Sequence, residues 1–458
     1  MTLQTVILAA GQGKRMHSEL PKVLHPIGGK ALLEHVVQTA SQLQTTAEPI
    51  VIYGHQGEQV RHTLAHLAIT WVEQKDQLGT GHALQQALPH LAEKGQVLVL
   101  YGDVPLISLN TLKKLILNTP AQAIGMITAT LPNPTGLGRI IRDAKNEIIA
   151  IVEEKDANAE QQQITEINSG IYLIPATLLF QWLPRLKNKN NQKEYYLTEI
   201  IELAKKENIS IYSTQPQQPE EISGVNDRVQ LATLERFYQR QQAEKLMYQG
   251  VTLLDPNRFD LRGKLQVGQD VTIDINVIIE GDVKIGHHCL IGPNTLLRNV
   301  TIGDHVEIKA NSILDGAEIA PHCTVGPFAR LRPGAELSSH SHVGNFVEIK
   351  NSIIGKETKI NHLSYIGDSE IGEKVNIGAG TITCNYDGVN KHKTIIGDNA
   401  FIGSNTELIA PVTVGAGATI GAGSTITRDA PPNQLTVCRA QQRSIENWQR
   451  PKKKEKEF

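Results

Sequence analysis

The pattern of apolar and polar positions divides the chain into two parts. Up to about residue 227, short apolar runs alternate with amphipathic segments, as in TVILAAG followed by KALLEHVVQTASQL. Continuous apolar runs indicate strands buried on both faces, and the amphipathic segments indicate helices that cover them. This alternation predicts a parallel, doubly wound α/β sheet, in which ligands bind at the carboxyl ends of the strands.

The second pattern is a short repeat that begins near residue 266. An aliphatic residue recurs every six positions, for example in VTIDIN, VIIEGD, VKIGHH and, near the end, VGAGAT and IGAGST. This period is typical of a left-handed parallel β-helix built from hexapeptide units, three of which complete one coil. We expect the aliphatic residues to stack inside in one column. Residues 382–394 break the rhythm and predict a functional loop.

A long segment with one polar face, VQLATLERFYQRQQAEKLMYQG, separates the two patterns and ends at Gly250. It predicts a connecting helix. We therefore divide the 458 residues into an α/β domain (1–228), a helical linker (229–249) and a β-helix domain with a C-terminal tail (250–458). Domains of this size can each bury a core of their own.

Composition excludes several functional classes. A net charge of −2 with 20% charged residues argues against a nucleic-acid-binding protein. The four cysteines show no C-x-x-C spacing, which favours reduced thiols over a zinc site or disulfides. Without a signal peptide or an apolar run long enough to span a membrane, we expect a soluble cytoplasmic protein. The terminal PKKKEKEF reads as a solvated tail, with a clamp for a phosphorylated ligand as the alternative.

Two features of the N-terminal part carry candidate chemistry. The first is LAAGQGKRM (8–16), a glycine-rich turn after a strand, with Arg15 inside it and Lys22 six residues beyond it. Backbone N–H groups of such a turn can cradle phosphates whose charge the two cations neutralise, although a plain strand–turn–helix explains the same pattern. The second is Asp103 at the end of the strand in LYGDVPL, which suits a divalent cation or, alternatively, a helix cap.

In the repeat region, His362 in KINHLSYIGD is the candidate general base. A histidine can accept a proton near neutral pH, as acyl transfer to an amine requires. The residues alone do not single it out, because other histidines of the same region compete with it: His287, His288, His305, His340 and His342.

Several motifs taken together resemble a known family. They occur in the order LAAGxGxRM, PKVL, QLGTGHA, YGDVPL, GxGRI, IVEEKDA, EINSGI and GVNDR, followed in the repeat region by RLRPGA, VGNFVEIK, HLSYIGD, NIGAGTITCNYDG and KHKT. The whole chain is similar to the bacterial bifunctional N-acetylglucosamine-1-phosphate uridyltransferase/glucosamine-1-phosphate acetyltransferases. One departure is Lys14, where the family commonly has threonine before the arginine of the first motif; it changes the charge around Arg15.

This resemblance implies a Rossmann-like nucleotidyltransferase domain that transfers uridylyl from UTP to N-acetylglucosamine-1-phosphate. It implies that a set of small residues and amides holds the nucleotide, namely Leu8, Ala9, Ala10, Gly11, Gln74, Gly79 and Thr80. Arg15 and Lys22 would bind the triphosphate, and Asp103 and Asn226 would ligate Mg²⁺, with Asn226 also at the UDP-sugar. The sugar would be held by Tyr101, Gly138, Glu153 and Asn168.

The resemblance also implies an acetyltransferase site on the β-helix, with His362 as the catalytic base. Glucosamine-1-phosphate would be bound by Arg332, Lys350, Tyr365, Asn376 and Lys391. Acetyl-CoA would be bound by Ala379, Asn385, Tyr386, Ser404, Ala422 and Arg439. Coils of neighbouring subunits would close this site, which implies a homotrimer. The product, UDP-N-acetylglucosamine, is a precursor of peptidoglycan and lipopolysaccharide.

Two other functions remain open on the sequence. One is a single-activity sugar-1-phosphate nucleotidyltransferase whose β-helix only assembles the oligomer. The other is a non-catalytic assembly protein that uses the repeat for trimer formation. His362, the Lys350/Lys391 pair and the loop 382–394 argue against the first, and Asp103 with Asn226 and the basic turn argues against the second.

Overall fold

The computed structural model describes residues 2–43, 45, 47–54, 56–190, 192–451 and 453. The chain forms two compact units, Met1–Gln242 and Ala243–Phe458, whose boundary lies inside helix α7 (Arg228–Tyr248). Leu234 of this helix belongs to a core cluster of the first unit, whereas Ala243 and Leu246 belong to the core of the second. In the described part of the chain, no helix combines the length and apolarity that crossing a bilayer requires.

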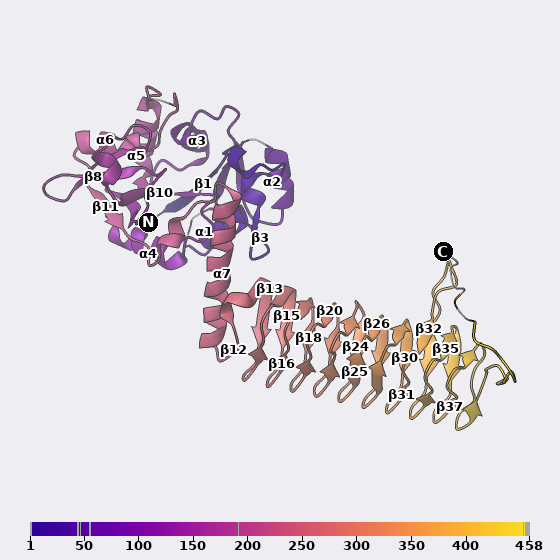
Figure 1. Cartoon of the computed structure of the whole chain (residues 1–458). Helices are drawn as coiled ribbons and strands as arrows, with labels where there is room; N and C mark the ends of the chain where they lie inside the picture. Colours follow the sequence, from indigo (N-terminus) through magenta and orange to yellow (C-terminus); the bar gives the residue numbers. More distant parts are fainter. Residues whose placement is uncertain are drawn as a thin grey trace, which may run out of the picture. The chain divides into compact units, whose positions relative to one another are not determined.

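The first unit is built on one mixed sheet (Figure 1). Its strands lie in the order β11 (Ile211–Thr214), β7 (Ile124–Thr130), β10 (Glu166–Pro175), β6 (Gln96–Tyr101), β1 (Leu3–Ala9), β4 (Ile50–Tyr53) and β5 (Thr70–Glu73). The hairpin β8 (Arg139–Arg142) and β9 (Ile148–Val152) extends from β10. The expectation of a wholly parallel sheet fails at β10, which is antiparallel to both of its neighbours. No α-helix lies between β7 and β10 to provide the crossover that a parallel strand needs.

Helices cover both faces of this sheet, as the apolar strands predict. Alternate residues of one strand enter different cores: Val6 and Leu8 of β1 lie in one cluster and Ile7 in the other. One face is covered by α3 (Thr80–Ala87), α5 (Ala176–Trp182) and α6 (Glu199–Lys206). The other face is covered by α1 (Leu32–Ser41), α2 (Gly57–Thr63) and α4 (Leu109–Asn118).

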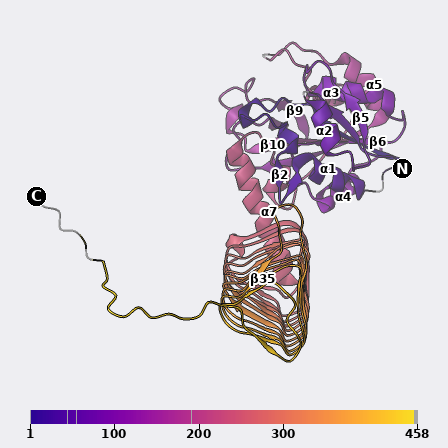
Figure 2. The same ribbon diagram turned by 90° about the vertical axis from the view of Figure 1, so that its right-hand side faces the viewer.

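The second unit is the predicted β-helix. Its short strands run from β12 (Thr252–Leu253) to β39 (Leu435–Thr436) and pair in parallel, coil on coil, in one eleven-stranded and one seventeen-stranded sheet. Figure 1 shows the coils side by side, and Figure 2 views them nearly end-on, so that their outlines superpose. The turns between strands are corners at which residues with positive φ recur, such as His340 (φ 60°), Phe346 (φ 55°) and Asn351 (φ 45°) in a single coil.

A column of aliphatic side chains fills the interior of the β-helix. Strand pairing aligns Ile279 with Leu297, Leu297 with Leu314 and Leu314 with Leu331, and all four are fully buried. Each coil thus contributes one side chain to the same line, and water is excluded along the whole axis.

The predicted interruption of the repeat lies between β32 (Ile382–Cys384) and β33 (Thr394–Ile396). Tyr386 pairs with Lys391 across a small antiparallel bridge, so this segment is an ordered hairpin. Of the basic C-terminal run, Lys452 and residues 454–458 lie outside the described residues, and the prediction of a solvated tail therefore stays a prediction.

Candidate functional site

The glycine-rich turn of the first unit lies at the carboxyl end of β1. The chain leaves the strand after Ala9 and makes a single 3-10 turn at Lys14–Met16, preceded by Gly13 in the left-handed region (φ 62°). A Cβ on Gly13 would lie 2.7 Å from the Cβ of Lys22. Glycine is therefore required here both for the turn and for the close approach of the Lys22 segment.

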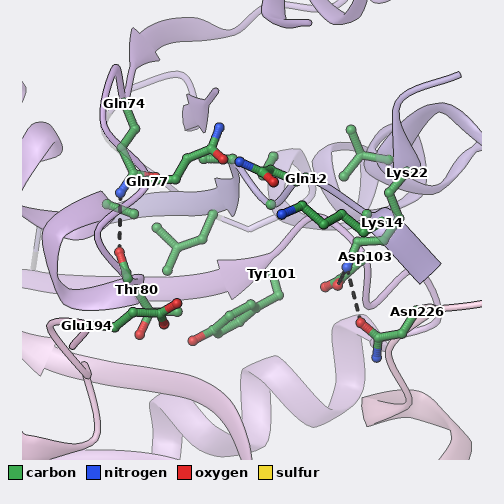
Figure 3. A pocket seen from close by; sticks show the side chains of 18 of the residues that line it. Gln12, Lys14, Lys22, Gln74, Gln77, Thr80, Tyr101, Asp103, Glu194 and Asn226 are labelled. Carbon is green, nitrogen blue, oxygen red and sulfur yellow. Dashed lines mark hydrogen bonds and ion pairs between the residues drawn. The ribbon is translucent and has the colours of Figure 1, made fainter. Parts of the chain in front are cut away.

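Asp103 and Asn226 meet around Lys22, although they are far apart in the sequence. Asp103 follows the end of β6, and the backbone N–H of Val225 donates to the Asp103 carbonyl at 2.9 Å, which places Asn226 next to it. The Lys22 ammonium contacts the Asp103 carboxylate and lies 3.3 Å from the Asn226 Oδ1 (Figure 3). The side-chain oxygens of Asp103 and Asn226 thus converge on the Lys22 ammonium at the edge of the sheet.

These groups line one cavity of about 630 Å³. Every residue expected at the nucleotide, the triphosphate or the metal contributes to its wall: Leu8, Ala9, Ala10, Gly11, Arg15, Lys22, Gln74, Gly79, Thr80, Asp103 and Asn226. Tyr101, expected at the sugar, lines it as well. The cavity is also lined by Lys14, the residue at which the first motif departs from the family, and by residues that were not singled out, namely Gln12, Gly13, Val23, Gln77, Ala83 and Glu194. Figure 3 shows the Lys14 side chain extending into the cavity toward Gln12, so Lys14 adds a third cation to the turn.

The start of α3 forms the opposite wall. The Gln74 amide donates to the Gly79 carbonyl at 3.2 Å, and the Gly81 N–H donates to the Tyr195 carbonyl at 2.8 Å. Glu194 therefore joins a wall built by residues more than a hundred positions earlier. No local pattern in the sequence marks this long-range pairing, which explains why Glu194 was missed.

Gly138, Glu153 and Asn168 lie beside the cavity and do not line it. The Asn168 N–H donates to the Gly138 carbonyl at 2.9 Å, and a Cβ on Gly138 would lie 3.4 Å from the Glu153 carboxylate. Burial and the neighbouring Glu153 charge raise the pKa of Tyr101, and burial also raises the pKa of Glu153. Tyr101 lines the cavity and lies near Glu153, so it connects these three residues to the cavity.

The second candidate site begins with His362 at the end of β28 (Lys359–His362). Its Nδ1 lies 2.6 Å from the Oδ1 of Asn345, the paired residue of the preceding coil. Because a carbonyl oxygen only accepts, Nδ1 carries the proton and Nε2 is left as the basic nitrogen. The His362 side chain is exposed, so this nitrogen is accessible to a substrate.

In the coils that follow His362 along the chain, small residues occupy the position equivalent to His362. The pairings Ile360–Ile377, Ile377–Ile402 and Ile402–Ile420 fix the register, and two residues beyond each strand position lie His362, Ala379, Ser404 and Ala422. The Arg439 guanidinium donates to the Ala422 carbonyl at 2.8 Å. The structure thus aligns the catalytic candidate with three of the residues expected at acetyl-CoA, and Arg439 contacts the last of them. We call these residues the His362 column: Asn345, His362, Ala379, Ser404, Ala422 and Arg439.

Three cations gather at another corner of the same coils. The Lys350 Nζ lies 3.4 Å from the Asp368 Oδ2, and the Arg332 guanidinium donates to Glu348 at 2.9 Å. The neighbouring Lys350 amine lowers the pKa of Lys391, and Arg332 lowers it further. We call Arg332, Lys350 and Lys391 the cationic cluster. The three positive charges repel one another, and a bound anion would relieve this repulsion.

Asp368 anchors the cluster. Burial raises its pKa, but hydrogen bonds from Asn351 and Asn385 and the charge of Lys350 lower it overall. A Cβ on Gly367 would lie 2.5 Å from the Tyr365 hydroxyl, so Tyr365 lies over this corner too. Asn385, expected at acetyl-CoA, donates a hydrogen bond to Asp368 at this corner.

The remaining two predicted residues are Tyr386, which pairs with Lys391 of the cationic cluster, and Asn376. Tyr386 is in the hairpin, exposed, with its hydroxyl donating to the Gly388 carbonyl at 2.5 Å. Asn376 lies on β31 (Asn376–Ile377), paired with Lys359 and Phe401. Asn345, Glu348 and Asp368 were missed because their partners lie 16 to 18 residues away on adjacent coils.

Comparison with known proteins matches both halves of the chain. Residues 5–158 match the model of the MobA-like NTP transferase domain, and residues 265–299 and 393–428 match the bacterial transferase hexapeptide (six repeats). These matches agree with the mixed sheet and the β-helix of the structure.

Curated relatives match over the full length. The bifunctional protein GlmU of Cellvibrio japonicus is 56% identical over 452 residues, covering 99% of this chain and 100% of the relative. That of Acinetobacter baumannii (strain ACICU) is 55% identical over 457 residues, covering 100% of both chains. That of Marinobacter nauticus is 54% identical over 452 residues, covering 98% of this chain and 99% of the relative. On this identity, sustained through both the α/β unit and the β-helix, the chain belongs to the family of bifunctional GlmU proteins.

Proposed function

We propose that the chain catalyses two steps of UDP-N-acetylglucosamine synthesis. The β-helix acetylates glucosamine-1-phosphate with acetyl-CoA, and the α/β unit transfers uridylyl from UTP to the N-acetylglucosamine-1-phosphate formed. The observation that carries the proposal is the full-length identity of at least 54% to proteins named bifunctional. Because both co-substrates are cytoplasmic metabolites, we also propose that the protein acts in the cytoplasm.

In the α/β unit, the walls of the cavity position two phosphorylated substrates. A phosphate oxygen of the sugar phosphate attacks the α-phosphorus of UTP, and the bond from this phosphorus to the bridging oxygen breaks, so that pyrophosphate leaves. Arg15, Lys22 and Lys14 stabilise the charge on the leaving group. The group around Tyr101, with Glu153 and Asn168, orients the sugar, and no covalent nucleophile is required.

Asp103 and Asn226 fit a magnesium site. A carboxylate and an amide oxygen are hard ligands, and both already contact one cation, the Lys22 ammonium. Among the described residues no group of three or more His, Cys, Asp or Glu could hold a metal, which agrees with a cation bound by few protein ligands and by phosphates. Such an ion would supply neutralisation of the phosphate oxygens.

On the β-helix, His362 Nε2 removes the proton from the substrate amine as the amine nitrogen attacks the thioester carbonyl carbon. The carbon–sulfur bond then breaks, and the thiolate of CoA takes up the proton from the imidazolium. Asn345 holds the ring in the required tautomer. The cationic cluster binds the substrate phosphate, with Tyr365 and Asn376 at the sugar, and the His362 column, together with Asn385 and Tyr386, binds acetyl-CoA.

We further propose that three copies of the chain assemble to complete this site. Within one copy the His362 column and the cationic cluster occupy different corners of the coils. An exposed apolar stripe follows the corner next to His362 and consists of Phe328, Phe346 and Leu363, which are 49%, 56% and 62% exposed. The centroids of the two phenyl rings are stacked 5.2 Å apart. A continuous exposed apolar stripe of this kind favours burial against another copy.

Self-association can be tested with Phe346→Asn, which suits the left-handed backbone at this corner. We expect the variant to sediment as a smaller species and to lose acetyl transfer while it retains uridylyl transfer. A variant that sediments like the unchanged protein, or an unchanged protein that sediments as a monomer, would contradict the proposal.

The main experiment is analysis of products by mass spectrometry with glucosamine-1-phosphate, acetyl-CoA, UTP and Mg²⁺. We expect UDP-N-acetylglucosamine, and N-acetylglucosamine-1-phosphate when UTP is left out. A product that never carries the acetyl group would instead support a single-activity nucleotidyltransferase with a structural β-helix.

A further inference from the structure

Four histidines form a ladder on the β-helix. His288, His305, His322 and His340 occupy the same corner of four successive coils, each with a left-handed backbone (φ 56°, 57°, 63° and 60°). Their rings stack on one another with centroid separations of 4.9, 4.9 and 4.7 Å and interplanar angles of 15°, 3° and 6°. All four are exposed. We call this set the histidine ladder.

The backbone fixes the spacing of the ladder. The N–H of His305 donates to the His287 carbonyl at 2.8 Å, and the N–H of His322 donates to the Asp304 carbonyl at 2.9 Å. The ring separations therefore match the distance between neighbouring strands of a sheet. Since the coils cannot slide against each other without breaking these bonds, adjacent imidazoles are held as pairs in the folded protein.

A carboxylate occupies the equivalent corner at each end of the ladder. Asp270 precedes His288, with its Oδ2 at 3.6 Å from the His288 Nδ1. Glu357 follows His340 and donates its N–H to the Ser339 carbonyl at 3.2 Å. Imidazole and carboxylate groups are the protein ligands that Zn²⁺, Ni²⁺ and Cu²⁺ use.

We propose that the histidine ladder is a binding site for borderline transition-metal ions, in which two adjacent imidazoles chelate one ion. Two nitrogens in neighbouring coordination positions of one ion, each at about 2.0–2.1 Å, lie about 3 Å apart. Rings stacked at 4.7–4.9 Å reach this separation by tilting their edges toward each other, which exposed side chains can do. Water completes the coordination.

The ladder is separate from both proposed active sites. In one coil, the corner of the ladder is at His340, the corner beside the His362 column is at Phe346, and the corner of the cationic cluster is at Asn351. Metal binding at the ladder therefore does not depend on whether either reaction has been assigned correctly.

The test uses Ni²⁺ titrated calorimetrically into the full chain without an affinity tag, at pH 7.5 in a buffer that does not chelate metals. The variant His305→Asn/His322→Asn removes every adjacent pair of the ladder. The matched control His288→Asn/His340→Asn removes as many histidines but keeps the central pair. Asparagine suits these corners, because Asn294, Asn311 and Asn399 adopt the same backbone region elsewhere in the β-helix.

We expect the unchanged protein and the control to bind Ni²⁺, and the central variant to bind it at least tenfold more weakly. Circular dichroism verifies that both variants fold. Equal affinity in the central variant and the control, or no binding by the unchanged protein, overturns the proposal.

Discussion

The nucleotide cavity and the acetyl-transfer site are built in opposite ways. The cavity is complete in one copy, because loops from distant parts of the chain meet at one edge of the sheet, as Lys22, Asp103 and Asn226 do. The residues proposed for acetyl transfer instead stay on two corners of the β-helix in one copy, one with His362 and one with Lys350.

The difference follows from the topology of each unit. In an α/β sheet the carboxyl ends of parallel strands lie together, so that loops far apart in sequence converge. In a solenoid each coil contacts only its neighbours, so residues are ordered in columns and the columns do not converge. In the proposed trimer the two columns meet only when copies associate, so the two reactions should respond differently to substitution.

The largest effect is expected for His362→Ala. Loss of the proton acceptor should lower acetyl transfer by about 10²–10⁴-fold and leave uridylyl transfer intact, since His362 and the nucleotide cavity belong to different compact units. Separate assays of the two half-reactions measure this. The matched control is His287→Ala, an exposed histidine of the same unit, which should retain both activities. A joint loss of both activities in the His362 variant would contradict the comparison.

Asp103→Ala should have the reverse effect. Removing the carboxylate that contacts Lys22 takes away a proposed magnesium ligand, and uridylyl transfer should fall by about 10²–10³-fold. Acetyl transfer should persist. Glu93→Ala removes an exposed carboxylate of the same unit as a control. Equal residual uridylyl transfer in the two variants would show that Asp103 has no role in the cavity.

A smaller effect is expected for Asn345→Ala, because Asn345 acts through His362. The ring would lose the acceptor that fixes its tautomer, and kcat for acetyl transfer should fall by about tenfold. Asn345→Asp keeps an acceptor at this position and should restore most of the activity, with the acidic limb of the pH profile changed by the new charge. Failure of aspartate to rescue the rate would indicate that Asn345 matters for packing only.

The smallest effect concerns pH. Because Lys350 and Arg332 lower the pKa of Lys391, its ammonium loses a proton at lower pH than an isolated lysine does. Phosphate affinity should therefore decline as pH rises through that lowered pKa. In Lys350→Gln the pKa of Lys391 returns upward, so the alkaline limb of kcat/KM for glucosamine-1-phosphate should shift to higher pH. A limb that moves to lower pH would contradict this arrangement.

The sequence predicted what depends on local pattern. The six-residue period gave the β-helix and its interruption, and the glycine-rich turn with Arg15 and Lys22 lies in the cavity as expected. Asp103 could be singled out because it follows an apolar strand. These predictions succeed because burial and turn chemistry act over a few residues.

The contacts that the sequence could not predict depend on the register between neighbouring strands. Asn345 meets His362, and Asn385 meets Asp368, only because coils of unequal length stack in a particular alignment. The antiparallel direction of β10 likewise depends on the absence of a crossover helix between the described strands β7 and β10. Glu194 joins the cavity through backbone bonds of Tyr195 with Leu78 and Gly81 that have no local signature.

The stacking of coils also determines which reaction fails first on heating. A coil inside the β-helix is held from both sides, whereas the last one is held from one side, in part by the bond from the Thr425 N–H to the Cys438 carbonyl at 3.1 Å. Fraying therefore starts where Ala422 and Arg439 lie, at the far end of the His362 column. A preparation warmed toward its melting range should therefore lose acetyl transfer while it retains uridylyl transfer.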